Sequence, residues 1–147
     1  MNTIDLTKTP LENMLTLINN CSSVQFDAED LTFSAPEPYT SLTDTALNTS
    51  VIVTATSLSP VSGIKTPKYR RLHLLSDFSD AQMTFSFPVG TTSTEILNFI
   101  IANRNWHTGS ALTGEFTLVD KFKITAPDTD YLYIGSVTVT IIFTVTP

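Results

Sequence analysis

The sequence predicts an α+β protein that is mainly β, with an antiparallel sheet or sandwich and two short capped helices. Two capping-box signals each open a stretch with helical spacing, and much of the remaining chain alternates apolar and polar residues with a period of two. Composition agrees, because 25 threonines and 14 serines accompany only 15% charged residues, against about 25% in an average domain. Threonine is β-branched and suits strands whose faces pack against neighbours.

The two helices are predicted from their first turns. Thr9 can cap the first helix, Pro10 suits its first position, and Glu12 can complete the capping box. Its apolar stripe consists of Leu11, Met14, Leu15 and Ile18. Residues 92–95 form a second capping box ahead of the second helix. Its apolar stripe consists of Ile96, Leu97, Phe99 and Ile100.

Strands are predicted wherever the period changes to two. The alternating stretches are residues 50–57, residues 83–88 and residues 137–146. On the apolar side of the last stretch lie Val137, Val139, Ile141, Phe143 and Val145. Residues 36–48 are polar and lack a period, so they are predicted to form a long exposed loop.

The order of helix, short strand, Ala-Pro-acid and long strand occurs twice. Residues 31–37 (LTFSAPE) resemble residues 122–128 (FKITAPD), and each follows a capped helix. We therefore interpret residues 1–147 as a single domain with a candidate internal duplication of residues 9–75 and 92–147. The alternative is chance, because capped helices and Thr/Val strands are common.

Length and charge restrict the class of protein. A chain of 147 residues can bury a core of ordinary size, and its net charge of −6 disfavours a free-standing nucleic-acid binder. Cys21 is the only cysteine, so no intrachain disulfide can form. The N-terminus does not resemble a signal peptide, and no apolar run is long enough to span a membrane. The sequence predicts a soluble protein that folds where it is made.

Residues 63–77 (GIKTPKYRRLHLLSD) contain half of the eight basic residues of the chain. From Lys68 onward the pattern predicts a strand, with Tyr69, Arg71 and His73 on one side and Arg70 on the other. The basic residues of segment 65–71 therefore divide between two faces, whereas a nucleic-acid platform gathers cations and aromatics on one face. We interpret the segment as a sheet strand in which Arg70 or Arg71 pairs with an acidic neighbour, and nucleic-acid contact is the alternative.

No catalytic, cofactor or metal motif is recognisable in the sequence, and an enzyme is not expected. A nucleophile at Cys21 would need His73 or His107 within hydrogen-bond reach. We expect instead that Cys21 is a small buried residue at the end of a helix. Trp106, with Arg104 and His107, either forms a small sugar-binding shelf or anchors the second helix to the core, and the anchor is favoured.

The packing motifs resemble a known family. They are residues 17–20 (LINN), 27–36 (DAEDLTFSAP), 48–55 (NTSVIVTA), 68–74 (KYRRLHL) and 133–139 (YIGSVTV). Together they resemble a small domain of virion structural proteins of large tailed bacteriophages. The resemblance implies a part of the phage head, neck, tail or baseplate, without catalytic residues, made and folded in the bacterial host cytoplasm.

We therefore expect a non-enzymatic structural component of a virion that contacts other virion proteins and copies of itself. Membrane and nucleic-acid partners are not expected, and no cofactor is expected. The alternatives are a receptor- or glycan-binding surface module and a small protein that contacts nucleic acid through residues 65–71. The candidate partner contacts are Tyr39, Leu42, Tyr69, Arg70, Arg71 and Trp106. Residues 1–8 are a further candidate, as an arm that orders on binding.

Overall fold

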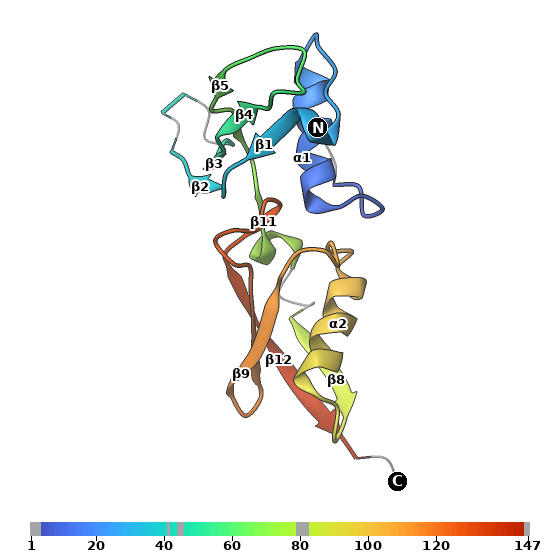
Figure 1. Ribbon diagram of the computed structural model, residues 1–147. Helices are drawn as coiled ribbons and strands as arrows, with labels where there is room; N and C mark the ends of the chain where they lie inside the picture. The colour runs from blue at the N-terminus through green and yellow to red at the C-terminus, as the bar shows by residue number, and fades with distance from the viewer. Residues whose placement is uncertain (1–3, 41, 44–45, 79–82, 146–147) are drawn as a thin grey trace. The chain divides into compact units, whose positions relative to one another are not determined.

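The computed structural model describes residues 4–40, 42–43, 46–78 and 83–145 (Figure 1). Contacts between residues divide the chain into two compact units. Unit 1 contains residues 1–71 and 128–132, and unit 2 contains residues 72–127 and 133–147. A short segment from the second half of the chain therefore belongs to unit 1. Each unit has its own helix and its own sheets.

In the residues that the structure describes, unit 1 contains one α-helix and six short strands. They are α1 (Pro10–Cys21), β1 (Leu31–Phe33), β2 (Glu37–Pro38), β3 (Thr49–Ser50), β4 (Val53–Ala55), β5 (Ile64–Lys65) and β6 (Lys68–Tyr69). The strands form two antiparallel sheets in the orders β1-β4-β5 and β2-β3-β6. The predicted cap of α1 is confirmed, because Thr9 Oγ1 accepts the Glu12 N–H at 3.1 Å and Glu12 Oε2 accepts the Thr9 N–H at 2.6 Å.

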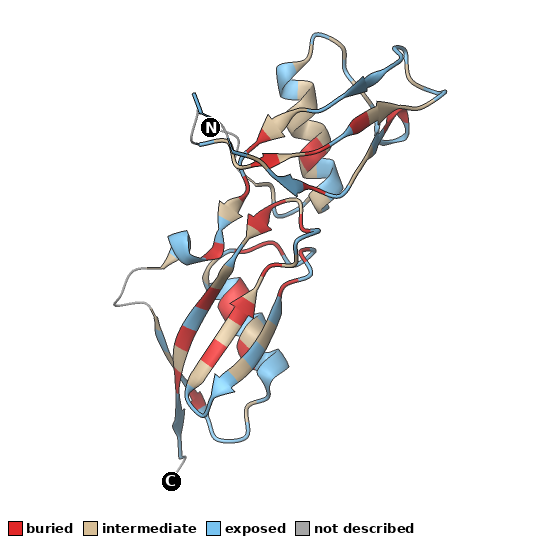
Figure 2. Cartoon of the chain, turned by 90° about the vertical axis from the view of Figure 1, so that its left-hand side faces the viewer, coloured by how far each residue is buried: buried red, intermediate tan, exposed pale blue. Residues whose placement is uncertain are grey.

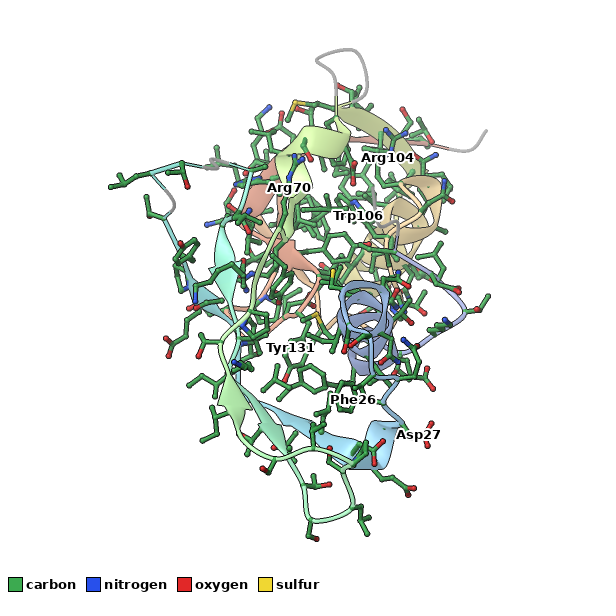
Figure 3. The ribbon with its side chains drawn as sticks, turned by 90° about the horizontal axis from the view of Figure 1, so that it is seen from above. Phe26, Asp27, Arg70, Arg104, Trp106 and Tyr131 are labelled. Atoms are coloured by element: carbon green, nitrogen blue, oxygen red, sulfur yellow. The ribbon has the colours of Figure 1, made fainter. Side chains whose placement is uncertain are left out.

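The core of unit 1 lies between α1 and these strands. Its buried members are Met14, Leu31, Val51, Val53 and Tyr69. Phe26 and Tyr131, both labelled in Figure 3, pack against this cluster from loops. Burial of such a cluster supplies the main favourable term that holds very short strands together.

Among its described residues, unit 2 contains one α-helix and a longer sheet. Its elements are β7 (Leu72–His73), β8 (Thr84–Pro88), α2 (Ser93–Asn103), β9 (Thr113–Leu118), β10 (Lys121–Thr125), β11 (Tyr133–Ile134) and β12 (Ser136–Thr144). The main sheet has the order β8-β12-β10-β9, and β11 pairs with β7. The β8–β12 and β11–β7 pairs are parallel, whereas β12–β10 and β10–β9 are antiparallel. The α+β, mainly β class is therefore confirmed, and within it two strand pairs are parallel.

The strand registers of unit 2 gather its apolar side chains on one face of the main sheet. These are Phe85 and Phe87 of β8, Val137, Val139, Ile141 and Phe143 of β12, Phe122 and Ile124 of β10, and Phe116 of β9. Helix α2 packs on this face through Ile96 and Ile100, which are both fully buried. The opposite face carries mainly Thr, Ser and Lys, and the alternation of buried and exposed residues along the strands is visible in Figure 2.

The two stretches of the candidate duplication occupy comparable strand pairs. Leu31 and Phe33 of β1 lie opposite Ala55 and Val53 of β4, and β10 lies opposite β12 in the same antiparallel way. The remaining neighbours differ, because β12 also pairs with parallel β8 whereas β4 pairs with antiparallel β5. The duplication therefore remains a hypothesis.

Several expectations about the N-terminal half need correction. Of the proposed arm, residues 4–8 already fold back on α1, since the Asp5 N–H donates to Asn13 Oδ1 at 2.8 Å, while residues 1–3 lie outside the described chain. The stretch 50–57 is not one strand, because it is interrupted between β3 and β4. There the Ile52 N–H donates to the Ser34 hydroxyl and not to a backbone carbonyl of a neighbouring strand. Cys21 is exposed, because it is the last residue of α1 and lies beyond the part that packs on the core.

The predicted loop over residues 36–48 is only partly a loop. Glu37 and Pro38 form β2, and the Tyr39 N–H continues this pairing by donating to the Asn48 carbonyl at 2.9 Å. Residues 41, 44 and 45 lie outside the described chain. Leu42, at 98% exposed, is the most exposed large apolar side chain among the described residues.

Candidate functional site

The basic segment does not form one continuous strand. β6 ends at Tyr69, β7 begins at Leu72, and a short 3-10 helix follows over Leu74–Asp77. The two strands belong to different units, because β6 pairs with β3 in unit 1 and β7 pairs with β11 in unit 2. The predicted alternation holds for Tyr69, Arg70 and Arg71 but not beyond them, because His73 is exposed and Leu74 is buried. Pairing partners far away in the sequence decide where each strand ends.

Arg71 lies inside unit 1, with only 3% of its surface exposed. Its Nε donates to Thr49 Oγ1 at 2.9 Å, and its Nη1 donates to the carbonyl oxygens of Asp128 and Asp130 at 3.0 Å each. Its backbone N–H donates to Asn48 Oδ1 at 2.8 Å. The expected acidic neighbours are therefore present, but the hydrogen bonds go to their carbonyl oxygens.

Tyr69 and Tyr131 extend this centre. The Tyr69 hydroxyl donates to the Tyr131 carbonyl at 2.9 Å, and the Tyr131 hydroxyl donates to the Ser34 carbonyl at 3.0 Å. Three carbonyl oxygens of segment 128–132 are thus bound by side chains of Tyr69 and Arg71. We call these groups the Arg71 centre, and its evident role is to hold that segment within unit 1.

Burial shifts the titration of these groups. Desolvation lowers the pKa of Arg71, and the nearby Tyr69, Asp130 and Asp128 oppose this effect. Burial raises the pKa of Tyr69, against a lowering effect of Arg71, and burial also raises the pKa of Tyr131. In each case the uncharged form of the side chain is favoured by a surrounding that excludes water.

The remaining basic residues of segment 65–71 do not share this site. Arg70 and Lys65 are exposed, and the Lys68 ammonium lies 5.1 Å from the centre of the Tyr39 ring. Tyr69 and Arg71 were proposed as partner contacts, but both are buried within unit 1 and cannot present their side chains to a partner. Tyr39, Leu42 and Arg70 keep surface that a partner could reach.

Trp106 is buried in unit 2 rather than displayed on a loop. Asn105 adopts a left-handed conformation (φ 55°) after α2, and the Trp106 N–H then donates to the Ile101 carbonyl at 2.9 Å. This turn directs the indole inward, where it packs edge-on against Phe78 and its Nε1–H donates to the Asp77 carboxylate. The core-anchor interpretation is confirmed.

Trp106 is therefore not a surface contact, and the sugar-binding shelf is not formed. His107 is buried beside it, and its backbone N–H donates to the Tyr133 hydroxyl at 3.0 Å. Arg104 stacks over the Phe78 ring at 5.2 Å. Both histidines of the chain belong to unit 2, whereas Cys21 belongs to unit 1.

One comparison with known proteins identifies a family. A family model described as a family of unknown function, DUF7941, matches residues 4–145. The chain belongs to this family. The DUF7941 match includes both units, with the Arg71 centre and the whole main sheet of unit 2. No curated protein and no solved structure matches the chain.

Beyond these buried centres, the DUF7941 chain exposes apolar side chains at one end of unit 2. Here β8 and β12 end and the β9–β10 turn lies (Figure 1). We call this group the apolar rim, and its exposed fractions are Val89 64%, Leu118 65%, Val119 90%, Phe143 37% and Val145 83%. The rim continues the apolar face of the sheet, because Phe143 follows Ile141 on the same side of β12.

Neither a membrane-spanning helix nor a metal-binding cluster is found in the described part of this DUF7941 chain. None of its helices has the length and apolar character needed to cross a membrane. Its described residues contain no group of three or more His, Cys, Asp or Glu side chains arranged to hold a metal ion.

The raised pKa of Tyr69 predicts a loss of stability at alkaline pH. The folded state holds the phenol proton more tightly than the unfolded chain, so this contribution is intact below about pH 10 and decreases as pH rises further. Urea unfolding measured between neutral pH and pH 11 should show this decrease, with up to about 1.4 kcal/mol lost per pH unit for one group. Tyr69→Phe should be less stable at neutral pH and lose less on raising the pH. An unchanged pH dependence in Tyr69→Phe would contradict the assignment.

Proposed function

We propose that this chain is a non-enzymatic structural component of a tailed-phage virion, in the head, neck, tail or baseplate, and that it acts through protein–protein assembly contacts. The observation that carries the proposal is the apolar rim of unit 2, where five apolar side chains gather at one end of a sheet. Exposed apolar groups of this kind usually mark surfaces that a partner covers.

Two further observations support an assembly role. The resemblance to virion structural proteins rests on stretches that form the cores and strand pairs of both units. In addition, only 15% of residues are charged, so large parts of the surface can be desolvated without burying unpaired charges.

The two alternative functions lose support from the side chains that suggested them. A glycan-binding shelf was to combine Trp106 with Arg104 and His107, but Trp106 and His107 are buried. Contact with nucleic acid was to use four basic side chains of residues 65–71, but Arg71 is bound inside unit 1 and Lys68 lies against Tyr39. Arg70 and Lys65 then remain exposed in a chain with a net charge of −6.

The direct test is mass spectrometry of purified particles from the phage that encodes the chain. Peptides of this chain should be present in a fixed ratio to the major structural proteins, and should remain after nuclease treatment and high-salt washing. Their absence from particles, while the chain is abundant in infected cells, would overturn the proposal.

A pair of variants tests which surface makes the contact. Val119→Asp lies in the exposed β9–β10 turn and should leave the folded structure unchanged while reducing incorporation into particles, because it places a charge within the apolar rim. Leu42→Asp makes the same change at an equally exposed side chain of unit 1 and serves as its matched control. Equal incorporation of both variants and the wild type would exclude the rim, whereas a loss confined to Leu42→Asp would move the contact to residues 36–48.

A further inference from the structure

The edge strand β8 has backbone groups without partners in the described part of the chain. β8 pairs in parallel with β12 alone, and the Met83 carbonyl and the Val89 N–H both bond to β12. Along a strand, the backbone N–H and C=O groups of successive residues point to alternate sides. In β8 the backbone groups of the odd-numbered residues therefore bond to β12, and those of the even-numbered residues point away from β12, to the free side of the strand. The outward set is the N–H and C=O of Thr84 and of Ser86, and the carbonyl of Pro88.

Pro88 limits how another strand can join this edge. Proline has no N–H, and the Pro88 carbonyl already accepts hydrogen bonds from the Thr91 N–H at 3.2 Å and the Thr91 hydroxyl at 2.7 Å. The usable edge is therefore a short window formed by Thr84 and Ser86. It offers two donors and two acceptors, with Phe85 at its centre.

This window is neutral, whereas natural edge strands are commonly protected by charged residues. Thr84, Phe85, Ser86 and Phe87 carry no charge, in a chain with a net charge of −6. A second copy approaching along this strand would therefore meet no like charge within the window. The net charge of −6 opposes self-association in general, and an uncharged contact strand adds no local repulsion to it.

Helix α2 presents an exposed aromatic ring beside the same edge. Leu97 lies toward β9, near Gly114, while Phe99 projects from the other side of the helix to pack on Phe87 and Phe85, with ring centres 5.3 Å and 6.3 Å apart. Phe99 still has 51% of its surface exposed. This ring lies on the edge side of α2, where a helix of an added copy would come to lie.

From these observations we propose that two copies of this chain pair through β8, antiparallel about a twofold axis at Phe85. Thr84 of each copy then lies opposite Ser86 of the other, and the four free backbone groups of each copy make four hydrogen bonds in all. This register needs nothing from Pro88. The two main sheets become one continuous sheet, and the Phe85 and Phe99 rings of both copies meet on its apolar face.

The proposal names one interface for the self-contact anticipated under the proposed function, and it rests on the free strand rather than on the apolar rim. Its first test is the mass of the purified full chain by light scattering over a range of concentrations. A species of twice the 16.1 kDa chain mass is expected, and it should persist at high salt because the interface is neutral. A monomer at every concentration would overturn the proposal.

Two edge variants test the interface itself. Ser86→Pro removes an outward N–H without touching the β12 ladder, and an edge strand tolerates proline at such a position. The double variant Thr84→Lys, Ser86→Lys places lysines opposite each other across the twofold axis, where like charges repel. Both should remain folded and become monomeric.

The matched control makes the same charge change on the other edge strand of the sheet. Thr113→Lys with Thr117→Lys replaces two exposed threonines of β9 and should leave the dimer intact. Circular dichroism checks the fold of every variant. If the folded β8 variants stay dimeric, or if the β9 control dissociates as readily, the β8 pairing is wrong.

The outcomes separate this inference from the proposed function. A monomer that is nonetheless present in particles would overturn the β8 dimer and leave the structural role standing. A β8-dependent dimer that is absent from particles would overturn the structural role and leave the β8 pairing standing.

Discussion

Replacing Arg71 with methionine is expected to lower the free energy of unfolding by roughly 3 kcal/mol or more. The guanidinium satisfies the Thr49 hydroxyl and the carbonyl oxygens of Asp128 and Asp130, and it is 3% exposed. A buried polar group that loses its partner costs about 1–3 kcal/mol, and methionine fills a similar volume without supplying a donor. Urea unfolding followed by circular dichroism measures the loss.

The neighbouring residue provides the matched control. Arg70 carries the same charge but is exposed, so Arg70→Met should change stability by no more than about 0.5 kcal/mol. Arg71→Lys should also lower the free energy of unfolding, by no more than Arg71→Met does, because an ammonium cannot bond to all three oxygens from the position of the planar guanidinium. Equal destabilisation by Arg70→Met and Arg71→Met would contradict the clamping role of Arg71.

Replacing Trp106 with alanine is expected to cost about 3–5 kcal/mol, as is typical when a large buried aromatic is removed. The indole is 3% exposed, packs edge-on with Phe78 at 5.6 Å and lies 6.4 Å from the Tyr133 ring. Its loss would leave a cavity between the end of α2 and residues Asp77 and Phe78. Urea unfolding measured by circular dichroism tests this, because the tryptophan itself is removed.

A milder change separates packing from hydrogen bonding. Trp106→Phe keeps an aromatic ring but leaves the Asp77 carboxylate without its Nε1–H donor, so a smaller loss of about 1–2 kcal/mol is expected. Asp77→Ala removes the other partner of the same bond and should cost a similar amount. If Trp106→Ala instead kept full stability and abolished binding to a glycan panel, Trp106 would be a binding residue and the anchor assignment would be wrong.

The helices and the fold class followed from the sequence because they depend on neighbours within one turn or one strand. Thr9 with Glu12 and Thr92 with Glu95 close their capping boxes as expected, since donor and acceptor lie three residues apart. The long C-terminal strand was also recognisable, because Val137, Val139 and Ile141 alternate on a buried face of β12. The inward position of Trp106 was favoured because a single tryptophan just after a helix usually anchors that helix to the core.

The candidate site was only partly predictable. The chain itself singled out Tyr69 and Arg71, but it offered no means of distinguishing buried Arg71 from exposed Arg70. Their difference depends on segment 128–132, which is distant in sequence and supplies the carbonyl acceptors. The free edge of β8 gave no signal either, because an edge strand and a central strand have the same alternation.

The sequence by itself determined the alternation of apolar residues in the strands, the N-terminal caps of the two helices and the mainly β class. These are set by interactions between residues close along the chain. Only the tertiary structure decided that the chain forms two units, that β8 pairs in parallel with β12, and that Arg71 is buried. Each of these depends on which distant segments meet. That choice is fixed by the burial of apolar side chains and the pairing of backbone groups over the whole chain, and no local pattern records it.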